Sequence, residues 1–345
     1  MINLKKIQVA DLEGKKILLR LDLDVPVENG EINDDSRLES SLETIDYLLQ
    51  KAQEIIILGH LGRPAGKDEK YSLKIVADWF SKNFEWETKE IKIEDFDGFQ
   101  VAEKIVLLEN LRFFKEEEEN NEDFAKKLAS CADLYVNDAF AVSHRAHASV
   151  SSITQFLPSY AGLRLQKEVE ELSKILNDPV RPLTIIIGGA KIETKLLLVE
   201  KMHHLADYVL VGGEIAEHTR ELAKVAHEKL AGKKSILFVA DLTSDKEDIS
   251  EVSIQNFIQV INSSKTIVWN GPMGEFEKCF DLGTREIAKA VANANVYTIV
   301  GGGETIEFLR KEGLLKKFKF VSTGGGAMLE FLAGIKLPGI EVLEK

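Results

Sequence analysis

The sequence predicts an α/β fold of two Rossmann-like, three-layer domains with parallel sheets, joined by a long interdomain helix. Short apolar runs alternate with stretches of helical spacing, which is typical of parallel sheets covered on both faces. The chain has 345 residues, more than one hydrophobic core usually supports. Residues 161–178 form a single amphipathic stretch that ends before Pro179, and we predict a helix there that links two α/β halves.

The first half of the chain predicts strands separated by helices. Its apolar runs are typical of buried strands and lie at residues 15–25, 54–60, 104–110 and 133–140. Apolar residues at steps of three and four predict helices at residues 41–52, 72–84 and 122–132.

The second half repeats this alternation. Strands are predicted at residues 181–189, 207–213, 235–241, 265–271 and 297–303. Helices are predicted at residues 192–206, 285–294, 304–313 and 326–334. Together the two halves predict two sheets, each with helices on both faces.

The composition is that of a soluble protein with an acidic balance. Hydrophobic residues make up 44% and charged residues 29%, and the net charge is -13. This charge argues against nucleic acid as a partner, although a local basic pocket still suits a small anion. No apolar run reaches the roughly 18 residues that a membrane span needs, and residues 1–16 lack the apolar block of a secretory signal. We therefore expect no membrane partner and a cytoplasmic location.

For two further features, an acidic run and the two cysteines, we expect no direct role in function. The run Glu116–Glu119 is interpreted as the solvent-exposed face of a helix. Cys131 and Cys279 lie far apart in the sequence, and we expect buried free thiols rather than a disulfide or a nucleophile.

Glycine-rich turns follow the predicted strands of the second half. Because ligands of open α/β sheets bind at the carboxyl ends of strands, such turns allow backbone N–H groups to approach a phosphate. Tight packing alone can explain one glycine pair, but four turns in one domain favour a phosphate site. None matches the dinucleotide fingerprint or a complete Walker A loop. The turns are Gly188-Gly189, Gly212-Gly213, Gly301–Gly303 and Gly324–Gly326.

Two lysines strengthen this hypothesis. Lys191 follows a glycine pair and Lys195 lies four residues later, so both project from the first turn of the predicted helix. Cations at a helix N-terminus oppose the helix dipole, and a bound polyphosphate would remove that conflict.

The first half places polar side chains at the ends of its predicted strands. Arginine side chains match carboxylate and phosphate oxygens in a bidentate way, so several of them in one cleft would bind a small anion that carries both groups. Each arginine alone could instead form a surface salt bridge, and His144 with His147 lacks the further ligands of a zinc site. The set comprises Asp22, Asp24, Arg37, His60, Arg63, Arg112, His144, Arg145 and His147.

At this point the chain resembles the phosphoglycerate kinase family over almost its whole length. The motifs stand in the family's order and are specific as a set. They are LRLDLDVP, GHLGRP, LLENLRF, YVNDAFAVSHRAHAS, FLPSYAG, IIGGAKIETK, VWNGPMGEFE, IVGGGE and STGGGAMLEFLAGIKLPG.

The resemblance implies a phosphoglycerate-binding domain at residues 1–162, an interdomain helix at 163–180 and a nucleotide-binding domain at 181–334. It implies that the tail at residues 335–345 packs back on the first domain. The implied reaction is reversible phosphoryl transfer between 1,3-bisphosphoglycerate and ADP, giving 3-phosphoglycerate and ATP, with Mg²⁺ as cofactor. We expect a hinge-bending monomer.

Site residues follow from the matching motifs. Phosphoglycerate would be held by Asp22, Asp24, Arg37, His60, Arg63, Arg112 and Arg145. The nucleotide would be held by Gly189, Lys191, Lys195, Gly212, Gly213, Asn270, Glu277, Gly301, Gly302, Gly303, Glu304 and Thr305. Glu304 would lie beside the magnesium ion. Catalysis would rest on Arg37, Lys195, Gly302 and Gly325.

The sequence also departs from the family's pattern. Asp24 replaces an asparagine, Glu214 replaces a glycine, Glu304 replaces an aspartate, and the segment D-I-G-P appears as residues 248–251. Residues 214–268 are shortened, so we expect a compact nucleotide-binding domain. Two alternatives remain open: a non-catalytic phosphoglycerate-binding paralogue with a degenerate nucleotide site, and an NAD-type oxidoreductase, for which a fingerprint is missing.

Overall fold

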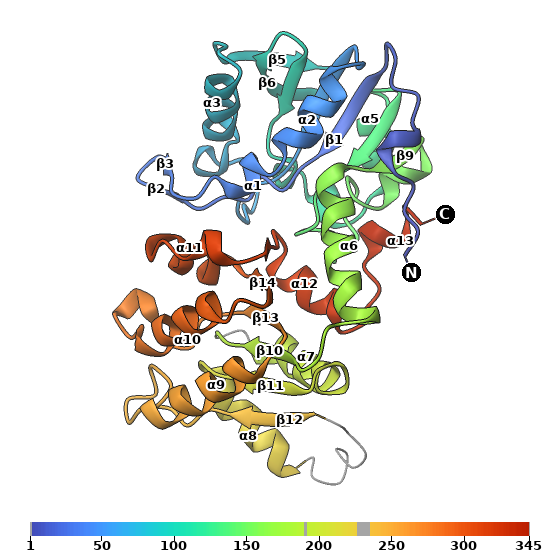
Figure 1. Cartoon of the computed structure of the whole chain (residues 1–345). Coiled ribbons are helices and arrows are strands. Elements are labelled where there is room, and N and C mark those ends of the chain that lie inside the picture. Colours follow the sequence, from blue (N-terminus) through green and yellow to red (C-terminus); the bar gives the residue numbers. More distant parts are fainter. Residues whose placement is uncertain (1, 190–191, 226–234, 345) are drawn as a thin grey trace. The chain divides into compact units, whose positions relative to one another are not determined.

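A computed structural model describes residues 2–189, 192–225 and 235–344, and the side chains of residues 192–197 and 221–225 lie outside this description. The chain divides into two compact units (Figure 1). Unit 1 comprises residues 1–170 and 336–345, and unit 2 comprises residues 171–335. The division falls within helix α6 (Leu163–Asn177).

Unit 1 contains a seven-stranded sheet in the order β5-β6-β7-β4-β1-β8-β9. Strands β7, β4, β1, β8 and β9 are parallel, whereas β6 runs antiparallel to both of its neighbours. A small hairpin is formed separately by β2 (Val27–Glu28) and β3 (Glu31–Ile32). The sheet strands are β1 (Lys16–Arg20), β4 (Glu54–Leu58), β5 (Lys89–Ile93), β6 (Phe96–Ala102), β7 (Ile105–Leu108), β8 (Leu134–Asn137) and β9 (Ser159–Ala161).

Alternate strand residues of unit 1 face two different hydrophobic cores. On one face, Ile17 and Ile57 belong to a core with α2 (Leu42–Leu49) and α3 (Lys74–Asn83). On the other face, Leu18 and Ile56 pack with residues of α5 (Glu122–Ala129). Because successive side chains of a strand point to opposite faces, continuous apolar runs are required for a sheet covered on both sides.

Short helices complete unit 1. They are α1 (Ser36–Glu39), α4 (Lys115–Glu118) and α13 (Pro338–Glu341), with the 3₁₀ turns η1 (Ile7–Val9), η2 (Glu69–Tyr71), η3 (Leu111–Phe113) and η4 (Ser152–Gln155). The C-terminal tail packs within this unit. Gly339 N–H donates to Ser143 O at 2.9 Å, and Lys5 N–H donates to Leu343 O at 2.8 Å.

Unit 2 contains a six-stranded, entirely parallel sheet in the order β12-β11-β10-β13-β14-β15. Its strands are β10 (Leu183–Ile187), β11 (Tyr208–Val211), β12 (Ile236–Val239), β13 (Thr266–Asn270), β14 (Tyr297–Gly301) and β15 (Phe320–Val321). Its helices are α7 (Ile192–Leu205), α8 (Ile215–Val225), α9 (Glu251–Ser263), α10 (Leu282–Asn293), α11 (Gly303–Lys311) and α12 (Gly325–Leu332), with the turns η5 (Phe276–Lys278) and η6 (Leu315–Lys317).

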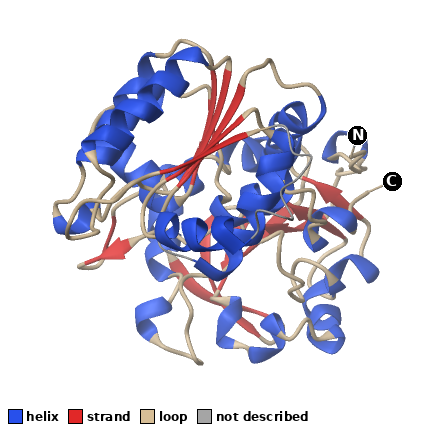
Figure 2. Cartoon of the chain, turned by 90° about the horizontal axis from the view of Figure 1, so that it is seen from below, coloured by secondary structure: helices blue, strands red, loops and turns tan. Residues whose placement is uncertain are grey.

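Helices cover both faces of the sheet of unit 2. Helices α9, α10 and α11 share one core with Ile186, Leu210 and Trp269 of the strands. Helix α7 packs beside α8 and α12. Figure 2 shows strands as a fan with helices along both sides. The three-layer α/β architecture predicted from strand–helix alternation is therefore confirmed.

Helices α8 and α9 and strands β9 and β15 were not predicted, and the structure differs from the sequence-based expectations at three further points. Strands β5 and β6 add an antiparallel edge that the apolar runs do not predict, since β5 is half-exposed and rich in charge. Glu117 is fully buried, so the prediction of an exposed acidic run is wrong at this residue. Cys131 is buried as expected, but Cys279 is exposed after η5. Within the described residues, none of the helices has the length and apolarity needed to cross a membrane.

Candidate active site

Polar side chains gather at the carboxyl edge of the sheet of unit 1. Because β7, β4, β1 and β8 are parallel neighbours, the residues that follow them lie at one edge. Asp22 and Asp24 follow β1, His60 follows β4 and Arg112 follows β7. The loop after β8 carries Arg145. The strand ends thus bring together most of the phosphoglycerate set that the sequence predicts.

Asp22, Asp24 and Arg37 are connected at the start of this edge. The Asp22 carboxylate is buried and accepts a hydrogen bond from Ala141 N–H at 2.7 Å. Burial raises the pKa of Asp22, while the nearby Arg37 opposes that rise. Arg37 donates to the backbone oxygen of Asp24, and Asp24 Oδ1 accepts from Gly62 N–H at 2.8 Å. Asp24 therefore fixes the loop that follows β4.

His60 is a buried, neutral side chain. Its pKa lies well below the usual value because of burial and because Arg20 and Arg112 are close. Arg20 donates from Nη2 to His60 Nδ1 at 2.9 Å, and His60 Nε2 lies 4.0 Å from Asp24 Oδ2. His60 thus connects a buried cation with the more exposed part of the site.

The remaining arginines differ in exposure. Arg112 is buried, donates from Nη1 to Gly62 O at 2.7 Å and lies 3.1 Å from Glu118 through Nε. Arg145 is half-buried and lies 4.0 Å from the same carboxylate. Arg63 is exposed and makes no hydrogen bond or ion pair with any residue in the described part of the chain. Glu118 therefore neutralises part of this positive charge.

Arg20 and Glu117 belong to the site region but were not predicted from the sequence. Arg20 is fully buried and donates from Nε to Ser149 Oγ at 2.9 Å. Ser149 Oγ donates in turn to Glu117 Oε1 at 2.6 Å. In the sequence, Arg20 could have been noticed as a charged residue inside the apolar run of β1. Nothing distinguishes Glu117 from its neighbours in the acidic run.

His144 and His147 complete the surroundings as uncharged groups. Burial and neighbouring arginines lower the pKa of His144 to about 4 and that of His147 to about 3. His147 Nδ1 lies 3.8 Å from Glu117 Oε1. Since both rings are neutral at pH 7, the positive charge of this edge comes from arginines.

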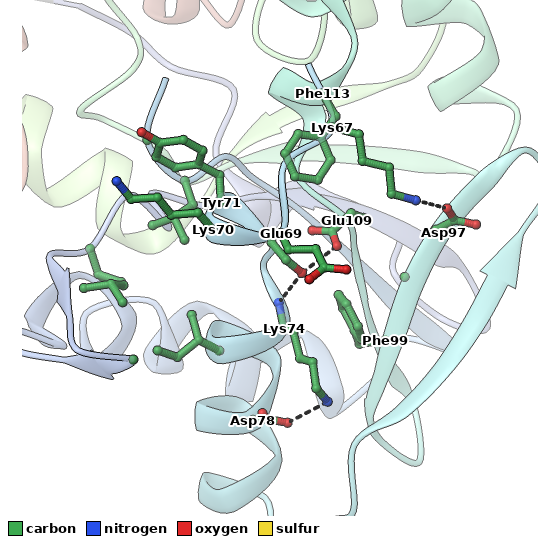
Figure 3. Close-up of a pocket in the computed structure, with 18 of the residues that line it drawn as sticks. Lys67, Glu69, Lys70, Tyr71, Lys74, Asp78, Asp97, Phe99, Glu109 and Phe113 are labelled. Carbon is green, nitrogen blue, oxygen red and sulfur yellow. Dashed lines mark hydrogen bonds and ion pairs between the residues drawn. The ribbon is translucent and has the colours of Figure 1, made fainter. Parts of the chain in front are cut away.

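A pocket of about 1130 Å³ adjoins the Asp24–Gly62 contact on unit 1. Figure 3 shows Lys67 paired with Asp97 and Lys74 paired with Asp78, at 3.2 Å and 3.9 Å. The Lys70 ammonium group lies 5.5 Å from the centre of the Tyr71 ring. Carboxylates outnumber lysines in the lining, so this pocket is less suited to a phosphate than the arginine-rich strand ends are.

The glycine turns of unit 2 are packed backbone against backbone. A Cβ atom on Gly213 would lie 2.7 Å from Gly189 N, and one on Gly188 would lie 2.0 Å from Pro272 O. Gly189 and Gly213 have φ values of 82° and 65°, which favour glycine. Their N–H groups donate to Pro272 O and Met273 O at 2.8 Å and 3.0 Å, and Gly212 is buried beside them. At these two turns the glycines serve close packing.

Helices α11 and α12 begin side by side. A Cβ atom on Gly325 would lie 3.0 Å from Gly302 Cα. Asn270 is buried at the end of β13 and donates from Nδ2 to Gly325 O at 2.9 Å. The first N–H groups of a helix have no acceptor within it, so two sets of donors meet here. This arrangement suits an anion.

The other predicted nucleotide residues of unit 2 vary in accessibility. Gly303 and Glu304 are exposed in the first turn of α11, next to the buried Gly301. Thr305 is fully buried, and its Oγ1 accepts from Gly271 N–H at 2.9 Å. Glu277 is exposed in η5. Lys191 and the side chain of Lys195 lie outside the described residues.

The described residues hold no cluster of three His, Cys, Asp or Glu side chains that could bind a metal ion by itself. Mg²⁺ is commonly held by one or two carboxylates together with substrate phosphates. The exposed carboxylate of Glu304, at a helix N-terminus that suits phosphates, fits this mode of binding. The two sites can therefore hold two anionic ligands, one on each unit.

Comparisons with known proteins show matches over most of the chain. The family model described as phosphoglycerate kinase matches residues 7–236 and 223–335. A phosphoglycerate kinase of Dictyoglomus turgidum is 39% identical, with 97% of this chain and 96% of that protein covered. One of Finegoldia magna is 39% identical over 394 positions, with 100% of both chains covered.

Solved structures of phosphoglycerate kinases also match the chain over almost its whole length. The structure of phosphoglycerate kinase from Coxiella burnetii has a TM-score of 0.79 and 34% identity, covering 99% of this chain and 98% of that one. The enzyme from Pyrococcus horikoshii OT3 has a TM-score of 0.83 and 28% identity, with 98% of both chains covered. The two family-model matches meet at residues 223–236, inside the segment 214–268 that the sequence predicts to be shortened.

Proposed function

The chain belongs to the phosphoglycerate kinase family and transfers a phosphoryl group to the carboxyl group of phosphoglycerate; we propose that residues 1–162 bind phosphoglycerate and residues 181–334 bind the nucleotide. The reaction is reversible, between 1,3-bisphosphoglycerate and ADP on one side and 3-phosphoglycerate and ATP on the other, and is a step of glycolysis.

The proposed phosphoglycerate site is the strand-end cluster of unit 1. Arg37, His60, Arg63, Arg112 and Arg145 supply donors that match phosphate and carboxylate oxygens. Asp22 and Asp24 shape the cluster through their bonds to Ala141 N–H and Gly62 N–H. The observation that carries this assignment is the set of hydrogen bonds among residues from four separate strand ends.

The proposed nucleotide site centres on the glycine turns Gly301–Gly303 and Gly324–Gly326 of unit 2. The N-termini of α11 and α12, which meet at Gly302 and Gly325, would bind phosphate oxygens, and Lys191 and Lys195 would add positive charge. Glu304 would hold Mg²⁺ together with the phosphates, and Mg²⁺ supplies neutralisation of phosphate charge when bound. Glu277 would contact the ribose. We propose that the second substrate, ADP or ATP, binds at this place.

The chemistry requires alignment and charge neutralisation rather than a base. The acceptor is a carboxylate, which is already ionised at pH 7. Arg37, Lys195 and the helix N-terminus at Gly325 would neutralise charge that develops on the moving phosphoryl oxygens. Because phosphoglycerate and the nucleotide are assigned to different units, we propose a hinge-bending movement that aligns the two ligands before phosphoryl transfer.

The remaining parts of the proposal follow from family and composition. We infer a cytoplasmic monomer whose substrates are small molecules, with no nucleic-acid or membrane partner. The non-catalytic paralogue gains no support, because the curated relatives and solved structures compared above are themselves named phosphoglycerate kinase.

Two variants test the assignment of ligands to units. Arg63→Ala removes an exposed cation without an internal partner among the described residues, so we expect 3-phosphoglycerate affinity to fall about tenfold or more and Mg-ATP affinity to stay unchanged. Glu304→Gln should weaken Mg-ATP alone, and Glu307→Gln, one turn further along α11, is its control. Calorimetry measures both ligands separately. Loss of the opposite ligand in either variant would contradict the assignment.

A further inference from the structure

A buried network of polar residues lies beneath the proposed phosphoglycerate site. Arg20 has no exposed surface, although it ends an apolar strand. Its guanidinium donates to Ser149 Oγ, to the backbone oxygen of Leu21 and to His60 Nδ1. Every one of its three nitrogens therefore has a partner, and one of those partners belongs to the site.

The contact with His60 determines which ring nitrogen carries the proton. A guanidinium only donates hydrogen bonds, so His60 Nδ1 must accept the bond of 2.9 Å from Arg20 Nη2. A neutral imidazole has one protonated nitrogen, and here that nitrogen is Nε2. Nε2 lies on the Asp24 side of the ring, 4.0 Å from Asp24 Oδ2. The Nε2 side of His60, which faces Asp24, is thus a hydrogen-bond donor.

The charge of Arg20 also opposes protonation of the ring. The charged and titratable groups that face His60 are Arg20, Asp24, Arg37, Arg112 and His147. Three of them are arginines, and Arg20 is the nearest. Glu117 is linked to Arg20 through Ser149, whose N–H and hydroxyl both donate to the Glu117 carboxylate at 2.9 Å and 2.6 Å. The carboxylate of Glu117 therefore reaches Arg20 through the hydroxyl group of Ser149.

We propose that Arg20 is a positioning residue that holds His60 as the neutral Nε2–H tautomer, so that His60 offers a fixed hydrogen-bond donor to the phosphoglycerate anion. This inference rests on the proposed function for the contact between His60 and the ligand. Arg20 does not touch the substrate. Its role is to keep the proton of the His60 ring on Nε2. If the ring could change tautomer, Nε2 would for part of the time be an acceptor, which cannot bind an anion.

The first test needs only the wild-type protein without substrate. ¹⁵N NMR of the histidine side chains, with His60→Gln to identify the signal, should show His60 as the Nε2–H tautomer and without titration from pH 6 to pH 8. A His60 signal typical of the Nδ1–H tautomer, or of a cation in this range, overturns the proposal.

The second test removes Arg20 together with its counter-charge. Arg20→Met/Glu117→Gln avoids an isolated buried charge, which alone would be strongly destabilising, and Glu117→Gln alone is the matched control that keeps Arg20. In the double variant we expect a mixture of tautomers and a His60 pKa raised into the titratable range. If the donor tautomer falls to between one half and one fifth of the population, KM for 3-phosphoglycerate rises about two- to fivefold, with kcat unchanged.

KM for 3-phosphoglycerate is compared between the double variant and the wild type at the same pH, so that the ionisation of the substrate affects both values equally. An unchanged tautomer and pKa in the double variant overturns the proposal whatever happens to KM. Addition of 3-phosphoglycerate to the wild type should shift the His60 Nε2 signal. If the signal does not shift, His60 does not contact the ligand, and this part of the proposed function is wrong. The tautomer of His60 is decided separately, by the NMR measurement without substrate.

Discussion

Gly302 and Gly325 lie so close that a side chain on Gly325 would place its Cβ 3.0 Å from Gly302 Cα. The first is the N-cap of α11 and has a φ of 96°, and the second is the first residue of α12. Asn270 lies beside both, because its Nδ2 donates to Gly325 O and would lie 3.5 Å from a Cβ atom on Gly302. Two helix N-termini can therefore act on one anion.

Gly325→Ala should disturb this meeting of helices. The added methyl group approaches backbone that cannot rotate away, so we expect a loss of about 1–3 kcal/mol in the free energy of unfolding and weaker binding of Mg-nucleotide. Gly326→Ala is the control for stability, because within the described part of the chain its Cβ position lies more than 4 Å from any atom outside its own helix turn. At this position in the first turn of α12, alanine should be neutral or should raise the free energy of unfolding by up to about 1 kcal/mol. Equal unfolding curves for the two variants would contradict the packing argument.

Arg37→Ala should lower turnover while the fold stays intact. Arg37 is half-buried in the short α1, and we propose that it neutralises charge on the moving phosphoryl group. Loss of one such donor costs about 10²–10³ in kcat. A coupled assay for ADP, with 3-phosphoglycerate and Mg-ATP, measures this. Arg181→Ala, which removes an arginine paired with Asp207 on the surface of unit 2, should leave kcat unchanged. A wild-type rate in Arg37→Ala would remove this residue from the mechanism.

Asp24→Asn should improve binding of phosphoglycerate. An asparagine oxygen can still accept the bond from Gly62 N–H, whereas the negative charge beside an anionic ligand is lost. One unit charge at this half-exposed position is worth about 1 kcal/mol, so we expect KM for 3-phosphoglycerate to fall about fivefold. Asp24→Ala, which also loses the loop contact, should not share this gain. A higher KM in Asp24→Asn would show that the carboxylate itself assists binding.

Asp138 should make the stability of the protein depend on pH. Burial raises its pKa to about 6, although hydrogen bonds from Thr44 and from Leu165 N–H oppose the rise. The folded state then holds this proton more tightly than the unfolded chain, whose aspartate pKa is about 3.9. The free energy of unfolding therefore falls as pH rises from about 4 to about 6.

Asp138→Asn lacks this titration and keeps an acceptor for Leu165 N–H. Relative to the wild type, the variant should gain about 2 kcal/mol between pH 4.5 and pH 7.5. Equilibrium urea unfolding at the two pH values measures the difference. A constant difference between variant and wild type would mean that Asp138 does not change its charge on folding in this range.

Much of the fold was readable because it depends on local patterns. The apolar run at residues 183–187 is continuous, as a strand buried on both faces requires, and α6 ends where Pro179 prevents its continuation. Strands β5 and β6 were not predicted, since the edge strand β5 is half-exposed and rich in charge, and β6 mixes buried with exposed positions. The family followed from the order of the motifs, and the comparisons confirm it.

By itself the sequence determined the alternation of central strands and helices in each half, the residue types at strand ends and the family. Only the tertiary structure decided that Glu117 is buried against Ser149, that Arg20 fixes the proton of His60, and that Gly302 meets Gly325. The physical reason is range: periodicity and turn chemistry act over a few neighbouring residues, whereas burial and pKa depend on segments that lie far apart in the chain and meet only when the strands are side by side.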